Sequence, residues 1–186
     1  LEKTFGQIVR GMAYPDSGIV NLQNEASYDN ICRYLQDLGI VYARTLGGDN
    51  DKFHLPPDWM AWMPTAHHGN SRIMGYIDKF LSDDPDGEKV YYAQRYPRLF
   101  YLWGHSFEFE NNQNWELLEE ICEKLGGHED VWYATNMEIY EYVQAYNALV
   151  FSADGQRVYN PTLKTVWFRT DAKVYCVDPG QMLTID

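Results

Sequence analysis

The 186-residue sequence predicts an α/β fold, because strand-like and helix-like patterns alternate along its first 149 residues. Short runs rich in β-branched and aromatic residues lie near positions 8, 42, 62, 101 and 132, with amphipathic helical patterns between them. After these, short strands are separated by turn residues at 154–155, 171–172 and 179–180, which is typical of antiparallel sheet. We therefore expect one domain over 1–149 and a β-hairpin extension over 150–186.

The helical patterns begin and end at ordinary capping signals. Residues 27–39 (SYDNICRYLQDLG) begin with Ser27 as N-cap and end before Gly39. Residues 114–127 (NWELLEEICEKLGG) repeat apolar residues at helical spacing and end at Gly126. Asn136 is the expected N-cap of the helix over 136–149.

Five segments are predicted strands of a parallel sheet: QIVRGMAY (7–14), IVYARTL (40–46), DWMAWMPT (58–65), RLFYLWGHSFEF (98–109) and DVWYAT (130–135). A closed eight-stranded barrel usually needs about 250 residues, so five strand–helix steps are too few for one. The sequence therefore leaves two architectures open, an open sheet and the later part of a barrel. Its first residues, LEKTFGQIV, have the pattern of a helix end leading into a strand, which favours the partial barrel.

Composition excludes some classes of function. The net charge of −12 would repel a phosphate backbone, so we expect no nucleic-acid partner. No apolar run has the length of a membrane span. The three cysteines lie far apart without a metal-ligand spacing, which argues against a disulfide scaffold or a zinc knuckle. Aromatic residues make up 16% of the chain, which suits either sugar stacking or a heavily packed core.

Several polar residues follow the ends of predicted strands, where α/β folds place their chemistry. His105 ends the most apolar strand, and it could be a metal ligand, a general acid or an ordinary core residue. His67 and His68 follow another strand; because neighbours on an extended backbone point in opposite directions, at most one of them is expected to face a site. Asp58 follows two prolines and has either a functional role or that of a turn cap.

Four segments together resemble the polysaccharide deacetylase (NodB-homology, carbohydrate esterase) family: VRGMAYPDSG, FHLPPDWMAWMPTAHH, RLFYLWGHSFEF and DVWYATNMEIYEY. The resemblance covers residues 5–150 and implies an irregular (β/α) barrel of the deacetylase type, of which this chain would hold a part. Members use a divalent metal, zinc above all, to hydrolyse N-acetyl or O-acetyl groups of chitin, peptidoglycan or related sugars. The resemblance also implies a bacterial protein of the cytoplasm, cell envelope or extracellular space, with an acetylated oligo- or polysaccharide as its partner.

The resemblance assigns roles to individual residues. AYPDSG (13–18) is similar to the family's third motif, a wall of the substrate groove, with Ala13 in place of the motif's arginine and Arg10 shortly before it. Asp58-Trp59 resembles the fourth motif, and LFYLWGH resembles the fifth, which ends in the proton donor. With the aromatic pocket expected beside these strand ends, the predicted catalytic residues are His105, Asp58 and Arg10, and the predicted substrate-binding residues are Tyr14, Pro15, Trp59, Trp62, Trp103 and His67.

The family's base and metal motifs have no counterpart here. KTFGQ (3–7) has Gly6 and Gln7 where the first motif has two aspartates, and HSFEF has Phe109 where the second motif has its second histidine. The resemblance thus implies that the metal half of the site lies upstream of Leu1 or does not exist. We expect these 186 residues alone to bind no catalytic metal tightly and to have no deacetylase activity. A missing segment or an oligomer contact would close the barrel's open edges.

Three hypotheses about function remain open. The first is a carbohydrate deacetylase whose site is completed upstream. The second is an inactive carbohydrate-binding or scaffold protein with a degenerate deacetylase fold. The third is an unrelated α/β hydrolase that holds its own metal with His67 or His68, His105 and Asp58.

Overall fold

The computed structural model describes residues 1–15, 18–19, 22, 26–46, 50–82, 97–170 and 173–185. The chain divides into two units, Leu1–Val131 and Trp132–Asp186. Part of the segment AYPDSG and the turn expected at 171–172 lie outside the described residues. The antiparallel strands begin at Val150, as the sequence indicates, whereas the boundary between the units follows Val131. The domain division at residue 149 therefore stays a prediction.

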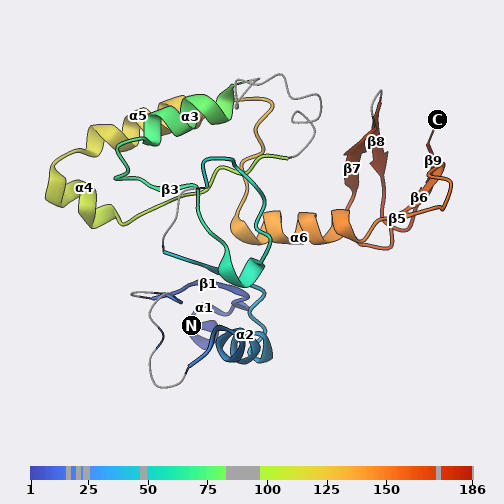
Figure 1. Cartoon of the computed structure of the whole chain (residues 1–186), viewed down its shortest axis with the longest axis horizontal. Helices are drawn as coiled ribbons and strands as arrows, with labels where there is room; N and C mark the ends of the chain where they lie inside the picture. Colours follow the sequence, from blue (N-terminus) through green and yellow to red (C-terminus); the bar gives the residue numbers. More distant parts are fainter. Residues whose placement is uncertain are drawn as a thin grey trace. The chain divides into compact units, whose positions relative to one another are not determined.

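The first unit alternates short strands with helices (Figure 1). Its elements are α1 (Glu2–Phe5), β1 (Gly11–Ala13), α2 (Tyr28–Asp37), β2 (Tyr42–Arg44), η1 (Trp59–Ala61), β3 (Ala66–His67), α3 (Ile73–Leu81), β4 (Leu102–Trp103), α4 (Ser106–Asn112) and α5 (Trp115–Leu125).

All strand pairs of the first unit that the structure describes are parallel. β1 pairs with β2, and β3 pairs with β4. A parallel bridge between Arg44 and Trp62 links β2 to the segment that leads into β3. The parallel direction predicted from the alternating pattern is confirmed for these pairs, which form two small sheets in place of the expected single one, and each pairing joins segments that are consecutive in the chain. The described sheets are small and close no barrel, and the partial barrel stays a prediction.

Capping residues explain where several helices begin and end. The Ser27 side chain accepts a hydrogen bond from the Asn30 N–H, and Gly39 follows the helix end with a φ of 85°, as predicted for α2. α6 (Asn136–Asn147) begins one residue earlier than expected, with Thr135 as its N-cap. Asn136 is therefore wrong as the cap.

All five predicted strands are shorter than expected or absent, and three of them differ most from the expectation. Residues 59–61 form the 3₁₀ helix η1, because Asp58 caps its first turn instead of continuing an extended run. β4 covers only residues 102–103, and the second half of the expected strand 98–109 is the helix α4. Residues 131–135 form no strand; Trp132 and Tyr133 are exposed, so the apolar run is not explained by burial in a sheet.

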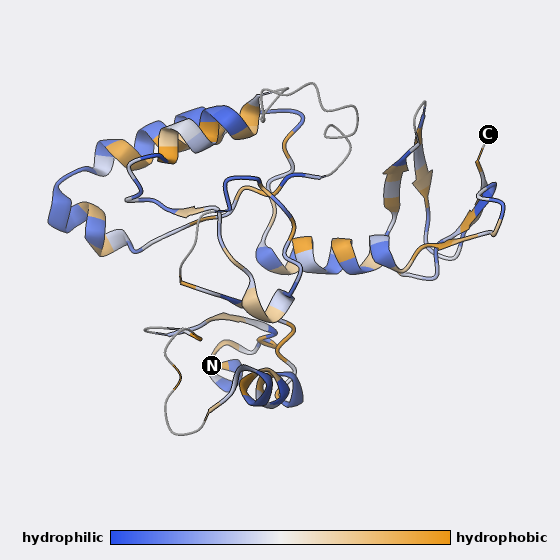
Figure 2. Cartoon of the chain, viewed as in Figure 1, coloured by the Kyte–Doolittle hydropathy of each residue, from blue (hydrophilic) through white to orange (hydrophobic). Residues whose placement is uncertain are grey.

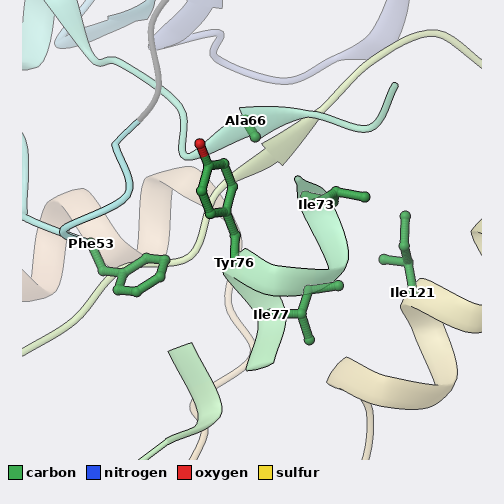
Figure 3. Packing of buried hydrophobic residues seen from close by; sticks show 6 residues of the cluster. All are labelled: Phe53, Ala66, Ile73, Tyr76, Ile77 and Ile121. Carbon is green, nitrogen blue, oxygen red and sulfur yellow. The ribbon is translucent and has the colours of Figure 1, made fainter. Parts of the chain in front are cut away.

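Among the residues of the first unit that the structure describes, two hydrophobic clusters form the core. The larger packs α3 against α5 and β3, and Figure 3 shows Ile121 of α5 pointing toward α3, where Ile73 and Ile77 lie. The smaller packs α2 against β1 and β2 around Tyr14, Ala43 and Met60. Hydrophilic and hydrophobic residues share each of these helices, as the amphipathic pattern of the sequence requires (Figure 2). The clusters fix the strands whose ends carry the candidate site.

Among its described residues, the second unit contains one helix, which the sequence pattern places in the first domain, and antiparallel strands as predicted. Its elements are α6, β5 (Val150–Phe151), β6 (Arg157–Tyr159), β7 (Val166–Arg169), β8 (Val174–Val177) and β9 (Met182–Thr184). Its own core surrounds Val158, Phe168, Tyr175 and Val177. The buried Asn160 side chain donates to the carbonyls of Lys164 and Val177, which satisfies a polar group that burial alone would destabilise.

Candidate metal centre

His67 and His68 both face the same carboxylate, although neighbouring residues of a strand point in opposite directions. β3 ends at His67, and His68 already lies in the following turn. The change of backbone direction lets both rings converge, with centroids 4.3 Å apart. The expectation that at most one of the two faces a site is wrong for this reason.

The His68 ring is buried, and its nitrogens make no aligned hydrogen bond within the part of the chain that the structure describes. Only 4% of the residue is exposed, and its backbone N–H donates to the Trp103 carbonyl across the β3–β4 pair. Neither ring nitrogen has a hydrogen-bond partner among the described residues. Nε2 lies 3.0 Å from Glu108 Oε2, close enough for an ion pair but without hydrogen-bond alignment. Buried polar atoms are nearly always paired, so this ring requires an explanation.

Gly104 allows the His68 ring its position. A Cβ atom at residue 104 would overlap the ring, with atoms of the imidazole well inside contact distance. The ring therefore packs directly on the backbone that follows β4. Phe109 stacks on its other side, with ring centroids 4.1 Å apart. These contacts hold the imidazole at the ends of β3 and β4.

Glu108 links the three histidines. It lies in the first turn of α4, which is separated from β4 by Gly104 and His105. Its Oε2 is 3.0 Å from His67 Nε2 and 3.0 Å from His68 Nε2. Its Oε1 is 2.7 Å from His105 Nδ1. One carboxylate thus serves two imidazoles with one oxygen and a third imidazole with the other.

His105 stands at the entrance of this cluster. It is the N-cap residue of α4, and 53% of its side chain is exposed, compared with 23% for Glu108 and 30% for His67. The Glu108 carboxylate holds Nδ1 of the His105 ring. The other ring nitrogen of His105, Nε2, is therefore the atom that can exchange a proton with a ligand. This placement suits a general acid better than a core residue.

The surroundings favour an ionised carboxylate and a neutral imidazole. The pKa of Glu108 is lowered, first by the hydrogen bond from His105 and further by the charges of the three nearby histidines. Burial lowers the pKa of His68, and repulsion from His67 lowers it further, more than the Glu108 charge restores. A negative oxygen next to an unprotonated nitrogen is the state in which both groups can bind a cation.

Aromatic rings form one wall beside the cluster. Trp103 contacts His67 with ring centroids 4.7 Å apart, and His105 at 5.9 Å. The Arg44 guanidinium lies over the same indole, 4.2 Å from its centroid. The structure therefore brings three of the predicted site residues together, namely His67, Trp103 and His105.

Asp58, Trp59 and Trp62 have structural partners instead. The Asp58 carboxylate accepts hydrogen bonds from the Met60 N–H and the Tyr28 hydroxyl, which is the turn-cap role considered for it. Trp62 is fully buried, and its ring meets Trp59 edge-on with centroids 5.0 Å apart. These contacts do not involve His105, and the predicted roles of the three residues in the site stay predictions.

The remaining predicted residues, Arg10, Tyr14 and Pro15, lie on either side of β1. Tyr14 is buried and donates its hydroxyl to the Met60 carbonyl, and burial raises the pKa of this hydroxyl to about 12. Pro15 is exposed next to it. Arg10 precedes β1, at the edge where the parallel strands begin, whereas His105 follows the end of β4. Catalysis by Arg10 stays a prediction that this placement does not favour.

Sequence reasoning missed Glu108 and the convergence of the histidines on it. The available signal was the spacing of His105 and Glu108, three residues apart after a glycine, which places two side chains on one face of a helical turn. The strand assigned to residues 98–109 hid that spacing. Within the described residues, His67, His68 and Glu108 form a group whose ligand atoms lie within 4.8 Å of one another.

Comparisons with family models, curated proteins and solved structures find no match to this chain. The deacetylase resemblance thus has the support of its motifs alone. Every helix among the described residues is too short or too polar to span a bilayer.

Proposed function

We propose that the chain is part of a polysaccharide deacetylase-type hydrolase in which His105 protonates the leaving group of an acetylated sugar. The observation that carries this proposal is the His105–Glu108 pair at the end of a parallel strand. The resemblance assigns the proton donor to the same histidine. Support also comes from the consecutive order of the parallel strands, which is the order of a (β/α) barrel.

His105 and Glu108 have distinct roles in this mechanism. When the imidazole is protonated, the Glu108 carboxylate accepts from Nδ1–H and stabilises the positive charge. Nε2–H then donates its proton to the departing amine of an N-acetyl substrate or the departing oxygen of an O-acetyl substrate. The nearby indole of Trp103 offers an apolar face to a sugar ring.

The family's divalent metal supplies Lewis-acid activation of the acetyl carbonyl and of the attacking water. The two aspartates of the family's first motif have no counterpart in residues 1–186. We therefore expect these residues alone to release no acetate, and the proposed activity belongs to a polypeptide that also carries the base.

The test measures acetate release from N-acetylated and O-acetylated oligosaccharides by the complete product of the gene. We expect release by the wild type and a loss of about 100-fold or more in His105→Gln, since a positioned general acid contributes about 10²–10⁴-fold. His54→Gln changes an exposed loop histidine and should retain full activity. Unchanged activity in His105→Gln would refute the assigned role, and no release from any acetylated sugar would refute the proposed reaction.

A second candidate function, carbohydrate binding without hydrolysis, is favoured by a separate observation in the second unit. A hollow of about 530 Å³ is lined by Trp132, Tyr142, Lys164, Thr165 and Trp167. Trp132 and Trp167 are 59% and 51% exposed, and such indole faces can stack on sugar rings. Under this hypothesis, Trp167→Ala abolishes retention on insoluble polysaccharide and acetate is never released.

A further inference from the structure

We infer that His67, His68 and Glu108 form a binding site for a transition metal ion of the zinc type. This donor set differs from the metal motifs of the resembling family, which the chain lacks. The inference goes beyond the proposed hydrolase activity and also replaces the sequence-based expectation that these residues bind no metal tightly. The two views predict opposite results in one titration.

The buried His68 side chain carries the inference. A cluster of histidines around a carboxylate can be explained by hydrogen bonds alone, and this explanation is sufficient for His67, whose Nδ1 accepts from the Gly69 N–H and whose Nε2 contacts Glu108. It fails for His68, because neither of its buried ring nitrogens makes an aligned hydrogen bond among the described residues, although Glu108 Oε2 lies 3.0 Å from Nε2. A metal ion bound to Nε2 satisfies the atom that faces Glu108.

The chemistry of the donors selects the class of metal. Two imidazole nitrogens and one carboxylate oxygen suit zinc and its neighbours in the first transition row. Calcium and magnesium prefer sites made almost entirely of oxygen, so they are poor candidates. The carboxylate also compensates part of the charge of a divalent ion.

Two of the three donor separations are already close to those of a zinc site, and all three donor atoms lie within 4.8 Å of one another. Glu108 Oε2 lies 3.0 Å from the Nε2 atoms of both His67 and His68. Donor atoms around a tetrahedral zinc ion are about 3.3 Å apart, given zinc–ligand bonds of about 2.0–2.2 Å. Three protein ligands leave a fourth position, and the partial exposure of His67 and Glu108 lets solvent or substrate reach it.

His67 must change its tautomer to become a ligand. In the described structure its Nδ1 accepts a hydrogen bond from the Gly69 N–H at 3.0 Å, so the proton of the neutral ring resides on Nε2. Ligation through Nε2 moves this proton to Nδ1 and breaks the Gly69 bond. One partly exposed hydrogen bond is a small loss beside three bonds to a metal ion.

His105 completes the arrangement as an orienting residue. Its Nδ1 is bonded to Glu108 Oε1, while the other oxygen of the carboxylate faces the two proposed histidine ligands. Partners of this kind fix the orientation of a ligating carboxylate, and their loss typically weakens metal affinity about 10–100-fold. The site therefore connects the proposed proton donor with the metal through a single side chain.

The test is a titration of the chelator-treated 186-residue chain with zinc chloride, in competition with a chromophoric chelator. We expect one zinc ion per chain with micromolar or tighter affinity, and cobalt(II) should give the visible absorption of a four-coordinate nitrogen–oxygen site. His67→Ala and Glu108→Gln should weaken binding by more than about 100-fold, and His105→Gln by about 10-fold. Circular dichroism verifies that each variant is folded, which matters most for the buried His68→Ala.

His54→Ala is the matched control, because it removes an exposed histidine distant in sequence and should leave zinc affinity unchanged. The absence of micromolar binding, or equal binding by the wild type and the His67 and Glu108 variants, would overturn the inference. The readout needs no substrate, so it is separable from the proposed function. A chain that binds zinc without releasing acetate upholds this site, whereas acetate release by the complete gene product without zinc binding here upholds only the deacetylase.

Discussion

The Glu108 carboxylate contacts all three histidines of the candidate site. Its two oxygens contact imidazoles from three positions, His67, His68 and His105, over distances of 2.7–3.0 Å. The lowered pKa of Glu108 means that its contribution to stability is present above the pKa of the unfolded state. It is lost as pH falls through the folded-state value, so acid should loosen this cluster.

The tautomer change of His67 is small in energetic terms. An ordinary protein hydrogen bond contributes about 0.5–1.5 kcal/mol, whereas metal binding of micromolar affinity corresponds to about 8 kcal/mol. The Gly69–His67 bond therefore lowers metal affinity by about one order of magnitude at most. Nitrogen NMR should show the His67 proton on Nε2 without metal and on Nδ1 with zinc; an unchanged tautomer would exclude His67 Nε2 as a ligand.

Gly104→Ala tests the packing of His68 at residue level. The new methyl group would overlap the imidazole, and we expect a loss of about 1–3 kcal/mol in the free energy of unfolding by urea, together with weaker zinc binding.

Gly75→Ala is the matched control for this substitution. Gly75 lies on an exposed position of α3, and an added Cβ would have no neighbour within 4 Å beyond the adjacent residues and the backbone of its own helix. Alanine should stabilise that helix by about 0.5–1 kcal/mol. Equal effects of the two substitutions would contradict the close packing at Gly104.

At the scale of elements, the turn after β4 determines which side chains come together in the candidate site. The run RLFYLWGHSFEF alternates enough apolar residues to resemble one long strand, and the sequence pattern alone does not reveal where extension ends. Gly104 marks that point, because the His68 ring occupies the space of its missing side chain. The turn into α4 then brings Glu108 back beneath the ends of β3 and β4.

Local signals explain what sequence reasoning predicted correctly. Ser27, Gly39 and Gly126 mark the limits of α2 and α5, and the parallel pairing follows from strand–helix alternation. The convergence of His67 and His68 depends on the backbone leaving β3 between them, which no periodicity shows. The position of Trp62 in the core likewise depends on tertiary contacts, since an exposed sugar platform and a buried anchor have the same sequence appearance.

The capping box of α6 supports a prediction about helix stability. The Thr135 hydroxyl accepts from the Glu138 N–H, and the Glu138 carboxylate accepts from the Thr135 N–H. Thr135→Ala should lower the free energy of unfolding by about 1 kcal/mol. Asn136→Ala should have a smaller effect, and the reverse order in urea denaturation would show that Asn136 caps the helix.

At the scale of the whole molecule, each unit has a core of its own. Ile77 belongs to the cluster that includes Ala66 of β3, and Val158 belongs to the core of the second unit. The proposed metal ligands lie entirely in the first unit. A substitution that destabilises the core of the first unit should therefore weaken metal binding. A substitution that destabilises the core of the second unit to the same extent should leave metal binding unchanged.

Ile77→Ala and Val158→Ala form a matched pair for this prediction. Each removes a fully buried side chain and should cost about 2 kcal/mol or more in the free energy of unfolding. Under conditions in which both variants are folded, zinc affinity should fall in Ile77→Ala and stay unchanged in Val158→Ala. The opposite pattern would contradict the assignment of the site to the first unit.

The most direct measurement of the central claim is a crystal structure of the zinc-loaded chain with anomalous diffraction recorded at the zinc edge. We predict one strong anomalous peak, about 2.0–2.2 Å from His67 Nε2, His68 Nε2 and a Glu108 oxygen. His105 should still contact the second oxygen of Glu108. A peak held by other residues, or none at this cluster, would contradict the claim that these side chains form a metal site.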